Sequence, residues 1–343
     1  MSADAIIKKK RMKRDKLHVN RLITKHFRKK EVYGLARKVW GLCRFLLIFG
    51  LGFVILYPLL QIMSKVFMPT EQYQDLSVIW IPKSLTLSNV VNALKYMNFW
   101  KALSNTLILC LSCAGIQIAV CSLTGYGFAR FRFPLREPLF LMVILTIIVP
   151  SQIIFLPSFV QYRFFDFFGI SRLLGRIAGR SYTDFTINLI DTRWSFWVPS
   201  LFGVGLCSGI FIYLFRQCFR NIPRELEEAA KIDGCGRMKT YLRIMLPNAR
   251  ASILTVFLFS FVWHWKEYTL SRTFFPQNYQ PLAVMLKLAV DNMINDVATR
   301  TNLPFQMGVT YASVMLYILP VLIIYIFTQR WFVEGVENSG IKG

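Results

Sequence analysis

Residues 221–247 read NIPRELEEAAKIDGCGRMKTYLRIMLP, a charged stretch set between two long apolar runs. Asn221 is suited to cap a helix, and Pro223 fits the first turn that would follow. Gly234 can take the left-handed conformation that ends such a helix. A second short helix is then expected over Lys239–Met245. The low apolar content and small alanines of this helical hairpin favour docking into a protein groove over lying on lipid.

The chain around this stretch is far more apolar than an ordinary soluble protein. Of its 343 residues, 55% are hydrophobic and 17% are charged, whereas roughly a quarter are charged in typical soluble domains. A helix needs about 20 mostly apolar residues to cross a bilayer, where its backbone must satisfy its own hydrogen bonds. Six spans are expected, near residues 45–64, 102–129, 138–162, 194–215, 249–270 and 309–329. The apolar run inside the fifth is short, so a re-entrant or buried helix is the alternative there.

The basic residues indicate how the chain is oriented. The net charge is +23, and 15 of the 41 Lys and Arg lie in residues 1–44, before the first expected span. Anionic cytoplasmic lipid attracts such a segment, which disfavours nucleic acid as its partner. With both termini inside, 28 of the 41 fall on the inner side, in agreement with the positive-inside rule. The sequence thus predicts a cytoplasmic N-terminal tail 1–44, a membrane domain 45–332 and a cytoplasmic C-terminal tail 333–343.

Three connections on the expected outer side are unusually long, residues 65–101, 163–193 and 266–300. They are rich in aromatic and charged residues rather than in Gly and Ser, which predicts small ordered elements instead of flexible linkers. These elements either form an external docking face or pack over the ends of the spans.

Residue patterns that would carry out chemistry are missing from the sequence. The histidines His18, His26 and His264 are far apart and lie in no ligand pattern. A CxxC at Cys110 and Cys113 lies inside an apolar run, where packing is the simpler interpretation. The sequence has no GxxxxGK[ST] phosphate loop. We therefore expect no enzymatic activity, no catalytic residue, no metal site and no cofactor bound by this chain.

One set of hairpin residues has the type and spacing of a known motif: Glu228, Ala229, Ala230, Gly234, Ile244, Leu246 and Pro247. This set resembles the EAA loop of ATP-binding-cassette (ABC) importer permeases, and it lies where that family has it, with two spans following. Residues 125–134, GYGFARFRFP, are similar to the carbohydrate-uptake, maltose-type branch of that family. The C-terminal sequences QRWFVEG at 329–335 and SGIKG at 339–343 are similar to it as well.

The resemblance implies an all-α, multi-pass permease of about six spans, with residues 221–247 as a cytoplasmic coupling loop. It implies that the seven motif residues dock on an ATPase, and that Ser339, Gly340 and Lys342 of the tail contact it. The implied partners are a second permease subunit in a heterodimer, two cytoplasmic ATPase subunits that carry ATP and Mg, and an extracellular sugar-binding protein. The implied location is the cell membrane of a prokaryote.

The implied substrate is a sugar or an oligosaccharide. A polyol or glycerol phosphate is the alternative within the family, because the motif concerns coupling and not the solute. An ion-coupled secondary transporter is the alternative outside the family, although uncharged spans disfavour it. The sequence identifies neither the particular sugar nor the residues that line its path.

Overall fold

The computed structural model describes residues 37–340 except positions 79 and 168, and it leaves aside the side chains at 151, 152, 182 and 330–340. The described residues form helices and turns, with one isolated antiparallel bridge between Phe165 and Ile187 in place of any strand. This agrees with the all-α expectation. The chain divides into two compact units, one that ends at Ile62 and one that begins at Met63.

The first unit consists of one apolar helix in its described part. It is part of the apolar helix Arg37–Val66, which has 30 residues. The most apolar window of that helix has a mean hydropathy of 2.3, and no residue in the window is buried. Apolar side chains such as Leu47 and Ile48 are exposed, as side chains that face lipid would be. The span expected at 45–64 lies within the helix, whose described part already includes residues 37–44. The rest of the expected tail, residues 1–36, lies outside the described residues.

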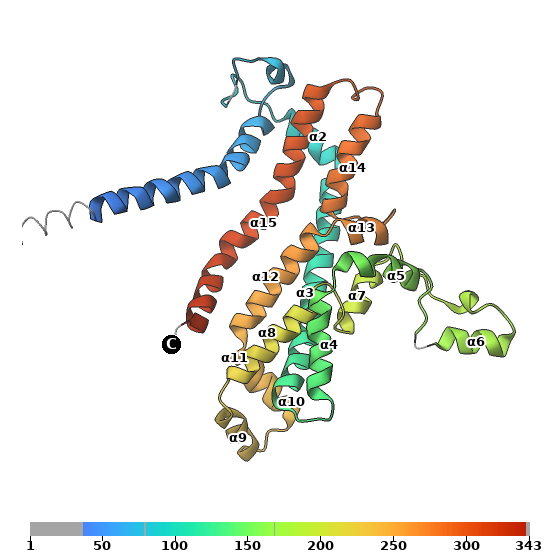
Figure 1. Cartoon of the computed structure of the whole chain (residues 1–343). Coiled ribbons are helices and arrows are strands. Elements are labelled where there is room, and N and C mark those ends of the chain that lie inside the picture. The colour runs from blue at the N-terminus through green and yellow to red at the C-terminus, as the bar shows by residue number, and fades with distance from the viewer. Residues whose placement is uncertain (1–36, 79, 168, 341–343) are drawn as a thin grey trace, which may run out of the picture. The chain divides into compact units, whose positions relative to one another are not determined.

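The second unit contains the remaining elements (Figure 1). Its α-helices are α2 (Ser88–Tyr96), α3 (Phe99–Arg130), α4 (Arg136–Ile148), α5 (Ser151–Arg163), α6 (Ile170–Ala178), α7 (Trp194–Leu201), α8 (Ser208–Asn221), α9 (Glu225–Ile232), α10 (Arg237–Thr240), α11 (Leu246–Asn248), α12 (Arg250–Lys266), α13 (Thr269–Phe274), α14 (Leu282–Asn295) and α15 (Leu303–Gly340). Two short 3₁₀ turns, η1 (Thr70–Gln74) and η2 (Tyr182–Phe185), and a π turn, η3 (Tyr241–Met245), complete the unit.

Helix α3 is the element around which the second unit packs. It contacts α7, α8, α12 and α14, and small or apolar side chains such as Ala102, Leu109 and Cys113 are buried along it. The crossing with α8 is closest at Gly125, where a Cβ would lie 2.7 Å from the Cβ of Phe215 and 2.9 Å from the backbone nitrogen of Arg216. Small residues at such crossings let helix backbones approach closely inside a membrane.

Fewer helices than the six expected are long and apolar enough to be complete membrane spans. Among the described residues, Arg37–Val66, Phe99–Arg130 and Leu303–Gln329 are long and apolar enough, and two bent pairs raise the number to up to five if each pair is one span. One pair is α4 with α5, bent by 105°. Pro150 lies between these two helices, and its missing N–H interrupts the helical hydrogen bonds. The other pair joins the hairpin to α12, with a bend of 77°.

The span expected at 194–215 is divided into two helices. Helix α7 ends at Leu201 and α8 begins at Ser208. The connection between them contains Gly203 and Cys207 with φ of +70° and +58°. This left-handed backbone cannot continue a right-handed helix. Hydropathy gave no sign of the break, because every residue across it is uncharged.

The three long connections contain ordered elements, as their composition predicted. Residues 65–101 contain η1 and α2, residues 163–193 contain α6 and η2, and residues 266–300 contain α13 and α14. Their role, as a docking face or as a cover over the spans, stays a prediction.

Candidate functional site

The charged stretch forms a helix and a turn, but not with the expected cap. Asn221 is the last residue of α8, and Pro223 lies before the first turn of α9. The N-cap residue of α9 is Arg224, which makes no side-chain capping hydrogen bond.

Helix α9 ends at Ile232, Asp233 is its C-cap residue, and Gly234 follows with a φ of +75°. The Cys235 N–H donates to the Ala230 carbonyl at 2.8 Å, and the Gly234 N–H donates to the Lys231 carbonyl at 3.0 Å. These two bonds form a Schellman motif, which satisfies the last carbonyls of a helix and requires a left-handed residue. Glycine takes that conformation without a steric cost.

The second arm of the hairpin is less regular than the single short helix that was expected. Helix α10 continues directly through the π turn η3 into α11, so the arm extends to Asn248. Pro247 lies inside α11, directly after the wider turn. Proline has no N–H to donate to a preceding carbonyl, so it fits beside a turn whose hydrogen bonds are already irregular.

A buried ion pair joins the first arm to α3. Arg130, the last residue of α3, lies with its Nε 3.1 Å from Glu227 Oε1 on α9, and the two side chains are only 5% and 13% exposed. Arg130 also donates to the carbonyl of Ile222, just before α9. Low exposure weakens solvent screening, so the pair depends strongly on both partners being present. The pair therefore fixes α9 against the end of a membrane-spanning helix.

An aromatic cluster joins the second arm to α3 and α8. The ring of Tyr126 lies 5.2 Å from Tyr241 and 5.6 Å from Phe219, between ring centroids. The hydroxyl groups of Tyr241 and Ser122 are 2.7 Å apart and hydrogen-bonded. Burial raises the pKa of the Tyr241 hydroxyl. Both arms are thus anchored to the membrane helices.

The seven residues predicted to dock are only partly exposed. Glu228, Ala229, Gly234 and Pro247 are exposed, Ile244 and Leu246 are half-buried, and Ala230 is buried. Ala230 therefore packs inside the protein, whereas the exposed members remain available to a partner.

Apolar side chains on the hairpin surface were missed from the sequence. Ile232 is 87% exposed, Met238 is 56% exposed and Leu242 is 52% exposed. These three apolar side chains are open to a partner in an otherwise charged element. In the sequence, the only indication of this surface was the presence of these apolar residues within a charged stretch.

A buried polar network inside the membrane helices was also missed. Gln117 on α3 donates to the Leu206 carbonyl at 2.8 Å and accepts from the Ser260 hydroxyl of α12 at 2.6 Å. His264 Nδ1 lies 2.8 Å from the Ser260 carbonyl. The network satisfies backbone groups that the break between α7 and α8 leaves open. The polar residues inside the apolar runs, Gln117, Ser260 and His264, were its signal in the sequence.

The predicted tail contact lies at the end of α15. This helix extends to Gly340, so Ser339 and Gly340 are in its last turn. Lys342 lies outside the described residues. The tail contact therefore stays a prediction.

Sequence comparisons place this membrane protein in a transport family. Residues 121–337, more than half of the chain, match the family described as binding-protein-dependent transport system inner membrane component. The chain belongs to this family of ABC importer permeases, as the resemblance of its hairpin motif implied.

Curated relatives match most of the chain. A probable ABC transporter permease protein of Pyrococcus horikoshii is 26% identical, over 87% of this chain and 96% of the relative. The arabinooligosaccharides transport system permease protein AraQ of Halalkalibacterium halodurans is 24% identical, over 90% of this chain and 100% of the relative. The sn-glycerol-3-phosphate transport system permease protein UgpE of Yersinia pestis is 25% identical, over 70% and 74%.

Solved structures share the fold. A chain from a bacterial ABC transporter involved in the import of the acidic polysaccharide alginate superposes with a TM-score of 0.65 at 19% identity, over 86% of this chain and 97% of that one. A chain from the alginate transporter in complex with an alginate-pentasaccharide-bound periplasmic protein gives a TM-score of 0.57 at 16% identity, over 86% and 96%. The fold is therefore that of a membrane permease.

Proposed function

We propose that this chain is one permease subunit of an importer that moves a sugar or oligosaccharide across the cell membrane of a prokaryote. The observation that carries the proposal is the anchored hairpin, which joins an exposed surface around Glu228 and Gly234 to the ends of α3 and α8. Support for a carbohydrate comes from the arabinooligosaccharide relative and from the alginate importer with the same fold.

The proposed complex contains a second, different permease subunit, two ATPase subunits and an external sugar-binding protein. ATP and Mg belong to the ATPase subunits, and this chain hydrolyses nothing. The name of the family, which is binding-protein-dependent, supports the external partner. In this arrangement both termini and the hairpin are cytoplasmic.

The mechanism follows from how the hairpin is anchored. When the ATPase subunits close on ATP, the docked hairpin moves with them. The Arg130–Glu227 pair and the Tyr126 cluster pass that movement to α3 and α8 as a rigid-body rotation, a common form of switching between two states. The bends at Pro150 and before α12 are positions where the bundle departs from straight helices.

Import of glycerol phosphate is the second candidate, because the glycerol-3-phosphate permease is as similar to this chain as the sugar permease is. The assembled complex in proteoliposomes, supplied with its binding protein, distinguishes the two. ATP-dependent uptake of a labelled oligosaccharide, without uptake of sn-glycerol 3-phosphate, supports the sugar. The opposite result favours the second candidate.

The docking role of the turn is tested by substitution at Gly234. A Cβ at this position would meet no atom of the chain within 4 Å, so the surface is open to a partner. Gly234→Asp is expected to leave the chain in the membrane and to reduce substrate-stimulated ATPase activity of the complex by about tenfold, equivalent to about 1.4 kcal/mol of lost docking. Membrane yield and ATPase activity are measured together.

Gly234→Ala is the matched control for this variant. Asp tolerates the left-handed conformation better than Ala does. If the residue serves only to end α9, Ala must impair activity at least as much as Asp. A larger loss for Asp supports contact with the ATPase, whereas equal losses contradict it.

The tail contact is expected to contribute less. Deletion of residues 339–343 should lower transport by about two- to threefold, because an exposed polar contact contributes about 0.5 kcal/mol. Initial uptake rates in proteoliposomes measure the change. Unchanged transport would show that these residues make no functional contact.

A further inference from the structure

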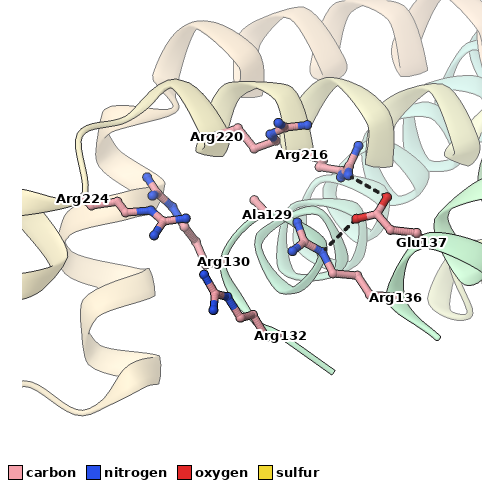
Figure 2. Close-up of a pocket in the computed structure, with 8 residues that line it drawn as sticks. All are labelled: Ala129, Arg130, Arg132, Arg136, Glu137, Arg216, Arg220 and Arg224. Carbon is pink, nitrogen blue, oxygen red and sulfur yellow. Dashed lines mark ion pairs between the residues drawn. The ribbon is translucent and has the colours of Figure 1, made fainter. Parts of the chain in front are cut away.

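A cavity of about 520 Å³ lies where α3 ends, α4 begins and α8 ends (Figure 2). The residues that line it are Ala129, Arg130, Arg132, Arg136, Glu137, Arg216, Arg220 and Arg224. We call this cavity the arginine pocket. It contains six guanidinium groups and a single carboxylate, drawn from separate segments of the chain. Arg224 belongs to the hairpin segment, but none of the seven motif residues lines the pocket.

The carboxylates around the arginine pocket do not balance its arginines. Glu137 lies 3.6 Å from Arg136 and 3.5 Å from Arg216, and Glu227 is already paired with Arg130. In the part of the chain that the structure describes, no carboxylate forms an ion pair with the remaining three, which are Arg132, Arg220 and Arg224. Guanidinium groups gathered in one concave site repel one another, and a bound anion relieves that repulsion.

Arg216 is held in place more firmly than a surface arginine. Its side chain is 10% exposed, and its guanidinium carbon lies 3.7 Å from the centre of the Phe140 ring. Its Nε is buried and has no hydrogen-bond partner among the described residues. A buried donor without a partner is costly, whereas the oxygens of a phosphate provide the acceptors that such a fork of donors fits.

The place of the arginine pocket in the fold favours a ligand with an apolar part. Arg136 begins α4, and Leu139, Met142 and Leu145 follow at three-residue steps on that helix. Residues at this spacing share one helix face, and these three are 42%, 61% and 50% exposed. An anion in the arginine pocket therefore lies next to an exposed apolar strip that continues along a membrane helix.

We propose that the arginine pocket binds a phosphate group, supplied by the headgroup of an anionic phospholipid. The arginines hold the phosphate at the end of the bundle, and the acyl chains follow the apolar strip of α4. Because Arg216 belongs to α8 and Arg130 anchors the hairpin, a bound headgroup stabilises the arrangement of α3, α4 and α8 around the hairpin.

The test uses the full-length chain in detergent, titrated with phosphatidylglycerol or phosphatidylcholine and followed by native mass spectrometry. Phosphatidylglycerol is expected to bind at least about tenfold more tightly than phosphatidylcholine. The double variant Arg132→Gln with Arg220→Gln is expected to lose this preference for phosphatidylglycerol. The control is the double variant Arg176→Gln with Arg180→Gln, which removes the same charge from exposed positions around α6. This control should keep the preference for phosphatidylglycerol. Equal losses in the two double variants would overturn the proposal.

A second variant gives an effect of opposite sign, which misfolding cannot produce. Glu137→Gln removes the only carboxylate that lines the arginine pocket, and its side chain is 70% exposed. This variant should bind phosphatidylglycerol several-fold more tightly. Unchanged or weaker binding contradicts an electrostatic site.

Two further measurements separate the lipid from other anions. If inorganic phosphate alone binds more tightly than phosphatidylglycerol does, the site takes a free anion and the lipid assignment is wrong. If the double variant keeps its lipid affinity but no longer assembles with the ATPase subunits, the arginines receive an acidic protein surface, and the proposal fails.

Discussion

Glu227→Gln is expected to reduce ATP-driven transport by about a hundredfold. Removal of one partner of a buried ion pair leaves the other charge buried and unpaired, which costs about 3–5 kcal/mol. Arg130 is that remaining charge, with a side chain only 5% exposed. The anchor of α9 would loosen, and movement of the hairpin would no longer reach α3. Uptake in proteoliposomes and protease sensitivity of the hairpin measure the two effects.

The control is Glu225→Gln, which makes the same change on the same helix at an exposed position. It should behave as the unmodified chain does. The double variant Arg130→Gln with Glu227→Gln removes both charges and should be less impaired than Glu227→Gln alone, because no uncompensated charge remains. A double variant that is as impaired as the sum of the two single variants would argue against a direct pair.

Gly125→Ala is expected to lower the unfolding temperature of the purified chain by about 5 °C, because overpacking costs about 1–3 kcal/mol. The added Cβ would lie 2.9 Å from the backbone nitrogen of Arg216. Since backbone cannot rotate away as a side chain does, α3 and α8 would have to separate. Thermal unfolding in detergent, followed by size-exclusion chromatography, measures the shift.

Gly127→Ala is the matched control for this crossing. It lies on the same helix, and a Cβ there would meet nothing within 4 Å. Alanine is also the better helix former, which offsets any small loss. Equal shifts for the two variants would show that helix propensity, and not the crossing with α8, decides the stability at this position.

Local patterns determined several features of this protein directly from the sequence. Apolar runs about 20 residues long have few structures open to them in lipid, so the all-α membrane fold followed from composition. Gly234, placed after a short amphipathic run, predicted where α9 ends, because few other residues take its φ of +75°. The motif from Glu228 to Pro247 indicated the family, and the match over residues 121–337 confirmed it.

Hydropathy did not predict the breaks in the spans. The chain bends by 105° between α4 and α5, and the segment 194–215 is divided into α7 and α8. Both breaks arise at uncharged residues, and the mean hydropathy of a window carries no information on backbone conformation. The sequence does contain proline and glycine at these two breaks. Their effect depends on neighbours that satisfy the freed backbone groups, as Gln117 does for the carbonyl of Leu206.

Only the tertiary structure decided which distant residues meet. Arg130 and Glu227 are far apart in the sequence, and each alone has the pattern of an ordinary surface charge, yet the fold brings them together as an ion pair with little exposure. The arginines of the pocket come from several segments that no spacing rule connects. Sequence periodicity reports the environment of a residue along its own helix, whereas charge pairing depends on where separate helices end in space.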